Sequence, residues 1–240
     1  MEDIEAIAAL QDPVRRRLYE YVAAQGREVG RNEAAEAAGV ARTLAAHHLD
    51  RLTEVGLLES GSRRLTGRSG PGAGRPAKVY TRVRTERSVS LPARDYRTAA
   101  ELLAQAAEEA GLDAGLCAAA RRRGEVLRGS AAPCGGLDEA MEMLAARGYE
   151  PHREGVGTAD GAPGADGADG AASGAGPSAV VRMRNCPFHA VAERFPPLVC
   201  GMNLALLEGL LGTDGAVRAR MDARPGECCV VVEPSKNNNH

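Results

Sequence analysis

The sequence predicts an α+β protein with a mainly helical N-terminal domain, a helical central region and a C-terminal domain that mixes helices and strands. Two amphipathic helix patterns separated by a glycine precede a basic hairpin pattern in the first third of the chain. An alanine- and leucine-rich helical stretch follows, and the rest alternates helix and strand patterns around four of the six cysteines. The expected domain boundaries are 1–90, 91–132 and 133–234.

Length and composition limit what the chain can be. Its 240 residues suffice for two small domains, and no run of about 18 apolar residues occurs, so we expect no membrane partner. The acidic start MEDIEAIAAL lacks the basic segment of a signal peptide, which predicts a cytoplasmic protein. Cysteines are usually reduced in that compartment, so clustered cysteines indicate metal or redox chemistry before disulfides.

The stretch DPVRRRLYEYVAAQG predicts a helix with a signal at each end. Asp12 can cap it, Pro13 suits its first position and Gly26 can end it. A second, short helix is expected over RNEAAEAAGV, ending at Gly39, and a third over ARTLAAHHLDRLTEVG. Two short helices joined at a glycine-containing turn form the helix-turn-helix pattern. The apolar stripe expected on the third helix is Leu44, His48, Leu52 and Val55, with Leu49 beside it.

Two strand patterns, LLESGSRR and AKVYTRV, flank the loop LTGRSGPGAGRP and predict a hairpin, or wing. Residues 61–88 carry eight basic side chains and one acid, whereas residues 93–240 carry 15 basic and 20 acidic ones. Such a local basic patch is typical of a nucleic-acid footprint, and a solvated linker is the alternative. The loop lacks the spacing of a phosphate-binding P-loop.

A helix that follows such a turn fits the major groove of DNA, and wing arginines can neutralise phosphates. We therefore predict double-stranded DNA as a partner. The residues expected to face it are Arg42, Thr43, Ala46, His47 and Arg51 on the third helix, and Arg63, Arg64, Arg68, Arg75 and Lys78 in the hairpin. Asp50 shares the outward face, whereas His48 is expected to pack inside.

Residues 8–85 resemble the winged-helix repressors of the ArsR type. The segments that carry the resemblance are DPVRRRLYEYV, AAEAAGVARTLAAHHLDRLTEVGLLE and GRPAKVY. The resemblance implies a DNA-binding winged helix-turn-helix and a homodimer that addresses two half-sites. The next helix pattern, RTAAELLAQAAEEAGL, places Leu102 and Leu103 on one side and is predicted to be a dimerisation helix. Packing on its own DNA-binding domain is the alternative. In the following helix, Cys117 is expected to be a small buried thiol.

The C-terminal domain is predicted to run helix, strand, long loop, strand, cysteine segment, helix, strand, strand. The loop, 155–178, holds eight glycines and almost no large side chain, so we expect it to be flexible. The cysteines that follow have the spacing C-x13-C-x27-C, at Cys186, Cys200 and Cys228. A strand end, a helix start and a strand start can converge at one edge of the domain. Because neighbours on a strand point to opposite faces, only one of Cys228 and Cys229 is expected to be a ligand.

Three converging thiolates predict a metal centre. Structural zinc sites usually show paired C-x2-C motifs, which are absent here, whereas iron–sulfur clusters tolerate long spacings and mixed ligands. His189, a solvent molecule or Cys134 could complete the set. Buried apolar cysteines with no ligand role are the plain alternative.

The segments RNCPFHAVAERFPPLVCGMNLALLEGLL and ARMDARPGECCVVV resemble the C-terminal half of the SufR-type regulators. The resemblance implies a C-terminal α+β cluster-binding domain in a dimeric repressor of iron–sulfur cluster assembly genes, which senses iron or redox state. Cys186, Cys200 and Cys228 match the family's three cluster cysteines, and the cluster would be of the 4Fe–4S or 2Fe–2S type.

Two other functions stay open. One is a winged-helix regulator that responds to zinc or to thiol oxidation without a cluster. The other is an enzyme with Cys186 as nucleophile and His189 as base. The sequence shows no residue that would orient such a base and no oxyanion element, so we expect no enzymatic activity.

Overall fold

The structure, a computed structural model, describes residues 2–63, 76–155 and 179–235. Its contacts divide the chain into two compact units, Met1–Arg94 and Asp95–His240. Apart from Gly155, the loop predicted at 155–178 lies outside the described residues. Within the described ranges, no helix is both long and apolar enough to cross a membrane.

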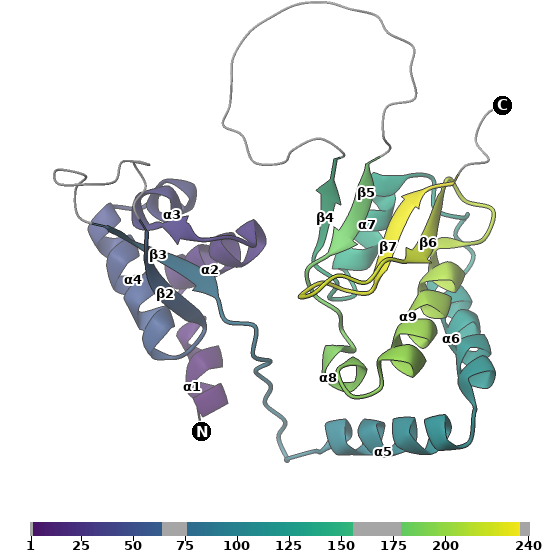
Figure 1. Cartoon of the computed structure of the whole chain (residues 1–240). Helices are drawn as coiled ribbons and strands as arrows, with labels where there is room; N and C mark the ends of the chain where they lie inside the picture. Colours follow the sequence, from purple (N-terminus) through teal and green to yellow (C-terminus); the bar gives the residue numbers. More distant parts are fainter. Residues whose placement is uncertain (1, 64–75, 156–178, 236–240) are drawn as a thin grey trace, which may run out of the picture. The chain divides into compact units, whose positions relative to one another are not determined.

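The first unit is a helical domain with a small antiparallel sheet (Figure 1). Asp12 caps its second helix, because Oδ1 accepts a hydrogen bond of 2.9 Å from the Arg15 N–H, and Gly26 ends that helix with φ 62°. The helices are α1 (Glu2–Ala9), α2 (Pro13–Gln25), α3 (Arg31–Ala38) and α4 (Arg42–Glu54), and the strands, in the order β1-β3-β2, are β1 (Val29–Gly30), β2 (Leu58–Arg63) and β3 (Ala77–Arg82).

The core of this unit lies between α2, α4 and β3. Leu18, Leu49 and Tyr80 are fully buried there. The predicted stripe on α4 is wrong at one position, since Leu44 is 42% exposed and Ala45 is buried instead. The buried positions of α4 follow the helical period and begin with a small alanine: they are Ala45, His48, Leu49 and Leu52.

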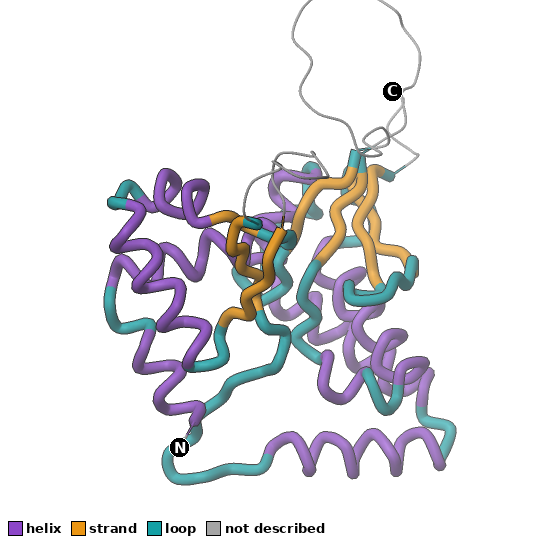
Figure 2. The backbone as a smooth tube through the Cα atoms, turned by 60° about the vertical axis from the view of Figure 1, so that its left-hand side comes forward, coloured by secondary structure: helices purple, strands orange, loops and turns teal. Residues whose placement is uncertain are grey.

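The second unit combines a four-stranded antiparallel sheet with five helices among its described residues. The helices lie mainly to one side of the sheet (Figure 2). The helices are α5 (Tyr96–Glu109), α6 (Asp113–Arg128), α7 (Leu137–Ala145), α8 (His189–Ala192) and α9 (Pro196–Leu211), and the strands, in the order β4-β5-β7-β6, are β4 (Pro151–Glu154), β5 (Val180–Met183), β6 (Val217–Met221) and β7 (Val230–Pro234).

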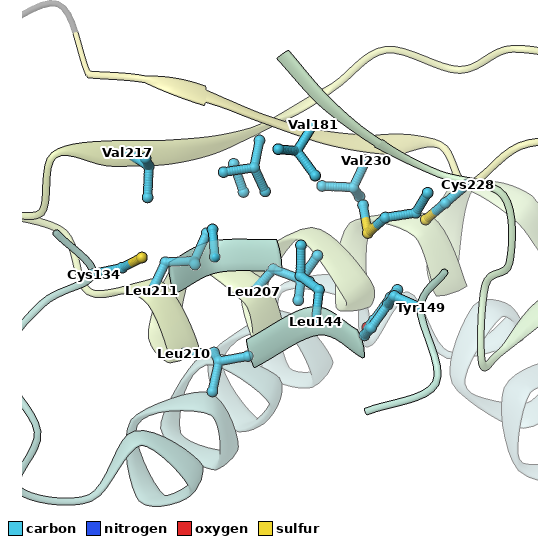
Figure 3. Close-up of a cluster of buried hydrophobic side chains, with 14 residues drawn as sticks. Cys134, Leu144, Tyr149, Val181, Leu207, Leu210, Leu211, Val217, Cys228 and Val230 are labelled. Carbon is cyan, nitrogen blue, oxygen red and sulfur yellow. The ribbon is translucent and has the colours of Figure 1, made fainter. Parts of the chain in front are cut away.

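The central element of the second unit is α9, which is apolar on all sides. Its Leu207 and Leu210 pack with Leu144 of α7 and Val181 of β5 in one core (Figure 3). On its other side α9 lies against α6 at a glycine contact. A Cβ atom added at Gly209 would lie 2.1 Å from the Arg121 carbonyl oxygen, so the two backbones are as close as they can be.

The opposite face of the sheet carries charged side chains beside the buried Val231. Arg182 of β5 is almost fully buried, with Nε 2.7 Å from the Glu154 carboxylate and Nη2 2.6 Å from that of Asp222. A buried guanidinium is tolerated because carboxylates on two sides satisfy its donors. Ion pairs therefore surround the buried Arg182 side chain on this face.

Candidate nucleic-acid interface and thiol site

The turn between α3 and α4 has the geometry of a helix-turn-helix. Gly39 adopts φ 64°, and the Val40 N–H donates a hydrogen bond of 3.0 Å to the Ala35 carbonyl, which ends α3 and redirects the chain. The first turns of α4 expose Arg42, Thr43 and His47, while Ala46 is half-buried. Exposed Leu44 lies among them, and sequence reasoning had assigned it to the core.

An acidic residue on α4 holds the wing against this helix. The Asp50 carboxylate accepts hydrogen bonds from Lys78 Nζ at 2.7 Å, from the Tyr80 hydroxyl at 2.7 Å and from Arg31 Nη2 at 3.1 Å. Burial by itself would raise the pKa of Asp50, but the donors from Lys78 and Tyr80 lower it below its usual value. Lys78, predicted to contact DNA, is thus also part of the domain's own polar network.

Basic side chains line a groove of about 1170 Å³ between α3, the start of α4 and the wing strands. Three of them, Arg42, Arg63 and Lys78, were predicted to contact DNA, and Arg27 and Arg31 were not. Nearby carboxylates pair with some: Arg63 lies 3.3 Å from Glu28, and Arg27 lies 2.5 Å from Glu33. The sequence signal for Arg27 and Arg31 was weak because Arg27 precedes α3 and Arg31 begins it, away from the basic hairpin.

The other predicted DNA contacts have different settings. Arg51 forms an exposed ion pair of 3.1 Å with Glu54 on the same helix. Arg64, Arg68 and Arg75 lie outside the described residues. His48 is buried, as expected, and its Nδ1 accepts a hydrogen bond of 3.4 Å from Arg15 Nε.

The cysteines at 186, 200, 228 and 229 form one group in the second unit. Cys186 follows β5, Cys200 lies in the second turn of α9, and Cys228 and Cys229 precede β7. The thiols of Cys186 and Cys229 interact with the Cys228 sulfur and lower the pKa of Cys228. The same interactions, together with burial, raise the pKa of Cys186 and of Cys229, whose thiol also interacts with Cys200. A negative charge shared by the group is therefore most stable on Cys228.

Both adjacent cysteines belong to this group, although only one of them was expected to be a ligand. That expectation assumed that they lie on the final strand, but β7 begins at Val230. Cys228 and Cys229 are in irregular backbone ahead of it, where the alternation of side chains along a strand does not apply. Cys228 is 2% exposed and its N–H donates to the Met183 carbonyl at 2.9 Å.

Two polar residues that sequence reasoning missed reach the thiols from other elements. Asn203 of α9 is fully buried, and its Nδ2 donates a hydrogen bond of 3.4 Å to the Cys228 sulfur. The buried Tyr149 hydroxyl donates to Asn203 Oδ1 at 2.5 Å. Burial, followed by the nearby thiols of Cys186, Cys228 and Cys229, raises the pKa of Tyr149.

The remaining candidate ligands are placed elsewhere. His189 begins α8, where its imidazole is 63% exposed and Nε2 lies 3.2 Å from the Glu193 carboxylate. Cys134 lies at the opposite end of the core from Cys228 (Figure 3) and donates to the Gly136 carbonyl at 3.3 Å. Cys117 was expected to be buried but is half-buried, and it lies where α6 approaches Gly201 of α9.

Among the described residues, no three or more His, Cys, Asp or Glu side chains are arranged to hold a single metal ion. One zinc ion needs sulfurs about 2.3 Å from a common point. In a 4Fe–4S cluster each thiolate binds a different iron, so the ligands lie further apart than around one ion. The donor set, four soft sulfurs of which one carries charge readily, fits the chemistry of an iron–sulfur cluster.

A family model described as a helix-turn-helix domain matches residues 10–61. The match extends from just before α2 into β2 and includes the turn at Gly39. The N-terminal unit thus contains a helix-turn-helix domain of the winged-helix regulator superfamily, which indicates a transcriptional regulator that binds double-stranded DNA. Comparisons with curated proteins and with solved structures gave no match.

Proposed function

We propose that this protein is a homodimeric repressor whose operator affinity responds to iron or redox state through an iron–sulfur cluster held by Cys186, Cys200 and Cys228. The observation that carries the proposal is that thiols from three separate parts of the chain, of which Cys228 is buried, gather at one place in a chain with a helix-turn-helix domain. The resemblance of the cysteine segments to SufR-type regulators supports iron–sulfur cluster assembly genes as the targets.

The arrangement favours Cys229 over His189 for the fourth ligand position. The Cys229 thiol contacts those of Cys200 and Cys228, whereas the His189 imidazole is exposed and contacts Glu193. A four-thiolate set drawn partly from adjacent residues is possible here because the backbone before β7 is irregular. A bound cluster would supply the group that responds to iron and to oxidants. These thiolates would hold its irons, and the cluster would be lost when iron is scarce or oxidants are present.

The state of the thiols can reach the rest of the unit through α9. Cys200 lies on this helix, and α9 and α6 meet backbone to backbone at Gly209 and Gly124. A buried cluster at the start of α9, formed by Phe195, Leu198 and Val199, packs with Ala104 and Ala107 of α5. A shift of α9 would therefore move α6 and α5 with it. A coupling of about 1–3 kcal/mol would change operator affinity by 5- to 150-fold.

The test is anaerobic purification, with a visible absorption spectrum and iron and sulfide counts on one sample. We expect a brown protein that loses its colour in a Cys200→Ser variant and keeps it in Cys134→Ser, a matched change at the far end of the core. Operator DNA, selected from a random library, should then bind the cluster-loaded and cluster-free forms with different affinities. Colourless protein after anaerobic reconstitution would contradict the cluster.

A regulator based on thiol oxidation is the second candidate, because the Cys186 and Cys228 thiols interact directly. Oxidation would join them in a disulfide. Mass mapping after mild oxidation distinguishes this function from the first, since it needs neither iron nor colour. A zinc-based regulator would be colourless too and would contain stoichiometric zinc.

A further inference from the structure

Besides Cys200, which belongs to the thiol group itself, α9 contributes a buried amide that bonds to a sulfur of that group. Asn203 has no exposed surface, and its Nδ2 lies 3.4 Å from the Cys228 sulfur. A buried amide loses water at both ends, so each end must find a partner inside the protein. Both ends of Asn203 do: the sulfur faces its nitrogen and the Tyr149 hydroxyl faces its oxygen.

The order of these bonds fixes which end of the amide meets the sulfur. With the Tyr149 hydroxyl donating to Oδ1 at 2.5 Å, the amide presents its N–H to Cys228. An N–H donor is suited to a sulfur that carries negative charge, and a metal-bound cysteine is such a thiolate. Tyr149 is itself locked, since it is buried next to the turn at Gly148 and packs in the core.

We infer that Asn203 is a positioning residue for the Cys228 thiolate and that Tyr149 sets the orientation of its amide. Asn203 holds the sulfur toward its neighbours and stabilises its charge, as outer-sphere donors do at metal sites. The inference rests on the proposed thiolate site, but it does not require that the site hold iron. It also gives α9 two links to that site, Cys200 and Asn203, on one helix.

The test uses the reduced, metal-free full-length protein and Cd²⁺ alone, a soft ion that the adjacent sulfurs of Cys186 and Cys228 can share. Affinity is measured by competition with a chromophoric chelator, and the sulfur-to-cadmium absorption band is recorded. Asn203→Leu keeps the size of the side chain and removes the donor, so we expect a loss of about 10- to 100-fold and a shifted band. Asn203→Asp places an acceptor and a negative charge beside the sulfur and should weaken binding at least as much.

Leu210→Ala is the control for a purely structural role. It removes a buried side chain from the same helix at a distance from Cys228 (Figure 3), so it should lower stability and leave Cd²⁺ affinity unchanged. Equal losses in Asn203→Leu and Leu210→Ala would overturn the inference, and so would an Asn203→Leu variant that binds like wild type.

If Asn203→Leu does not fold, Tyr149→Phe decides, because it removes one hydroxyl and keeps the packing. We expect a smaller but measurable loss of Cd²⁺ affinity, and unchanged affinity would overturn the role of the pair. A wild-type protein that binds no Cd²⁺ would contradict the thiolate site itself. If instead wild type and Asn203→Leu both bind Cd²⁺ tightly and equally, the thiolate site is supported and only the role of Asn203 is refuted.

Discussion

Lys78 of β3 and Asp50 of α4 form an ion pair of 2.7 Å that joins the wing to the helix proposed to enter the DNA groove. The Tyr80 hydroxyl and the Arg31 guanidinium share the same carboxylate. The wing strands and α4 thus have a common polar anchor. Because a network shared by four residues cannot be replaced by water at one position without disturbing the others, the anchor is expected to matter for both stability and DNA binding.

Asp50→Asn should destabilise the protein by about 1–2 kcal/mol, since the neutral amide keeps the shape and weakens the bonds from Lys78 and Tyr80. Chemical unfolding of the full chain, followed by circular dichroism, measures it. Glu54→Gln is the matched control: it breaks the exposed Arg51 pair and should cost less than about 0.5 kcal/mol. Equal costs for the two variants would contradict the anchor.

Leu44→Ala should leave stability nearly unchanged and weaken operator binding by about 1 kcal/mol or more. Leu44 is exposed beside Thr43 and His47, where an apolar side chain can contact a thymine methyl group. Leu49→Ala, on the buried side of the same helix, should instead cost about 2–5 kcal/mol of stability. Unfolding curves and binding titrations with selected operator DNA separate the two effects. A large loss of stability in Leu44→Ala would contradict the exposed position.

Some parts of the fold could be predicted from local sequence patterns, and others could not. Caps and glycines predicted the ends of α2 and α3 because those signals lie within a few residues of what they determine. The phase of α4 was harder, since alanine at 45 gives a weaker apolar signal than leucine at 44.

For the candidate thiol site, too, one part could be predicted from the sequence and another could not. The spacing of the cysteines predicted the group, but its partners could not be predicted. Tyr149 and Asn203 are 54 positions apart in the chain, and only the packing of α9 beside the sheet brings them together.

Stability should fall as the pH drops below about 6.5, partly because of His48. Burial lowers the pKa of His48 below its ordinary 6.5, and its Nδ1 must stay unprotonated to accept from Arg15. The unfolded chain takes up a proton near 6.5 while the folded chain does not, so acid favours unfolding, by at most about 1.4 kcal/mol per pH unit. Above that pH His48 contributes no slope.

Unfolding free energies of wild type and His48→Leu between pH 5 and 8 test this, and the variant should show the shallower decline. His152 adds a slope of the same sign, because burial and the nearby Arg184 lower its pKa. His152→Leu should therefore remove a separate part of the pH dependence of the unfolding free energy. A pH dependence identical in wild type and His48→Leu would refute the buried, neutral histidine.

Gly209→Ala should destabilise the second unit by about 1–3 kcal/mol or more, because the new Cβ would lie 2.1 Å from the Arg121 carbonyl oxygen. The two helices would have to move apart. Gly115→Ala on α6 is the matched control, since nothing lies within 4 Å of its Cβ position, and it should stabilise the helix by about 0.5–1 kcal/mol. Thermal unfolding of both variants compares them directly. A Gly209→Ala protein as stable as wild type would mean that α6 and α9 are not in close contact.

Leu103→Glu should convert the proposed homodimer into a monomer. Leu102 and Leu103 of α5 are 62% and 72% exposed in the single chain, an apolar pair that a second copy would cover. A charge placed there would be buried without a partner in the dimer, so association should weaken. Sedimentation velocity measures the mass, and operator binding should fall with it, because two recognition helices are needed for two half-sites. Gln105→Glu adds the same charge on a polar exposed position of α5 and should stay dimeric. A dimeric Leu103→Glu protein would place the interface on other residues.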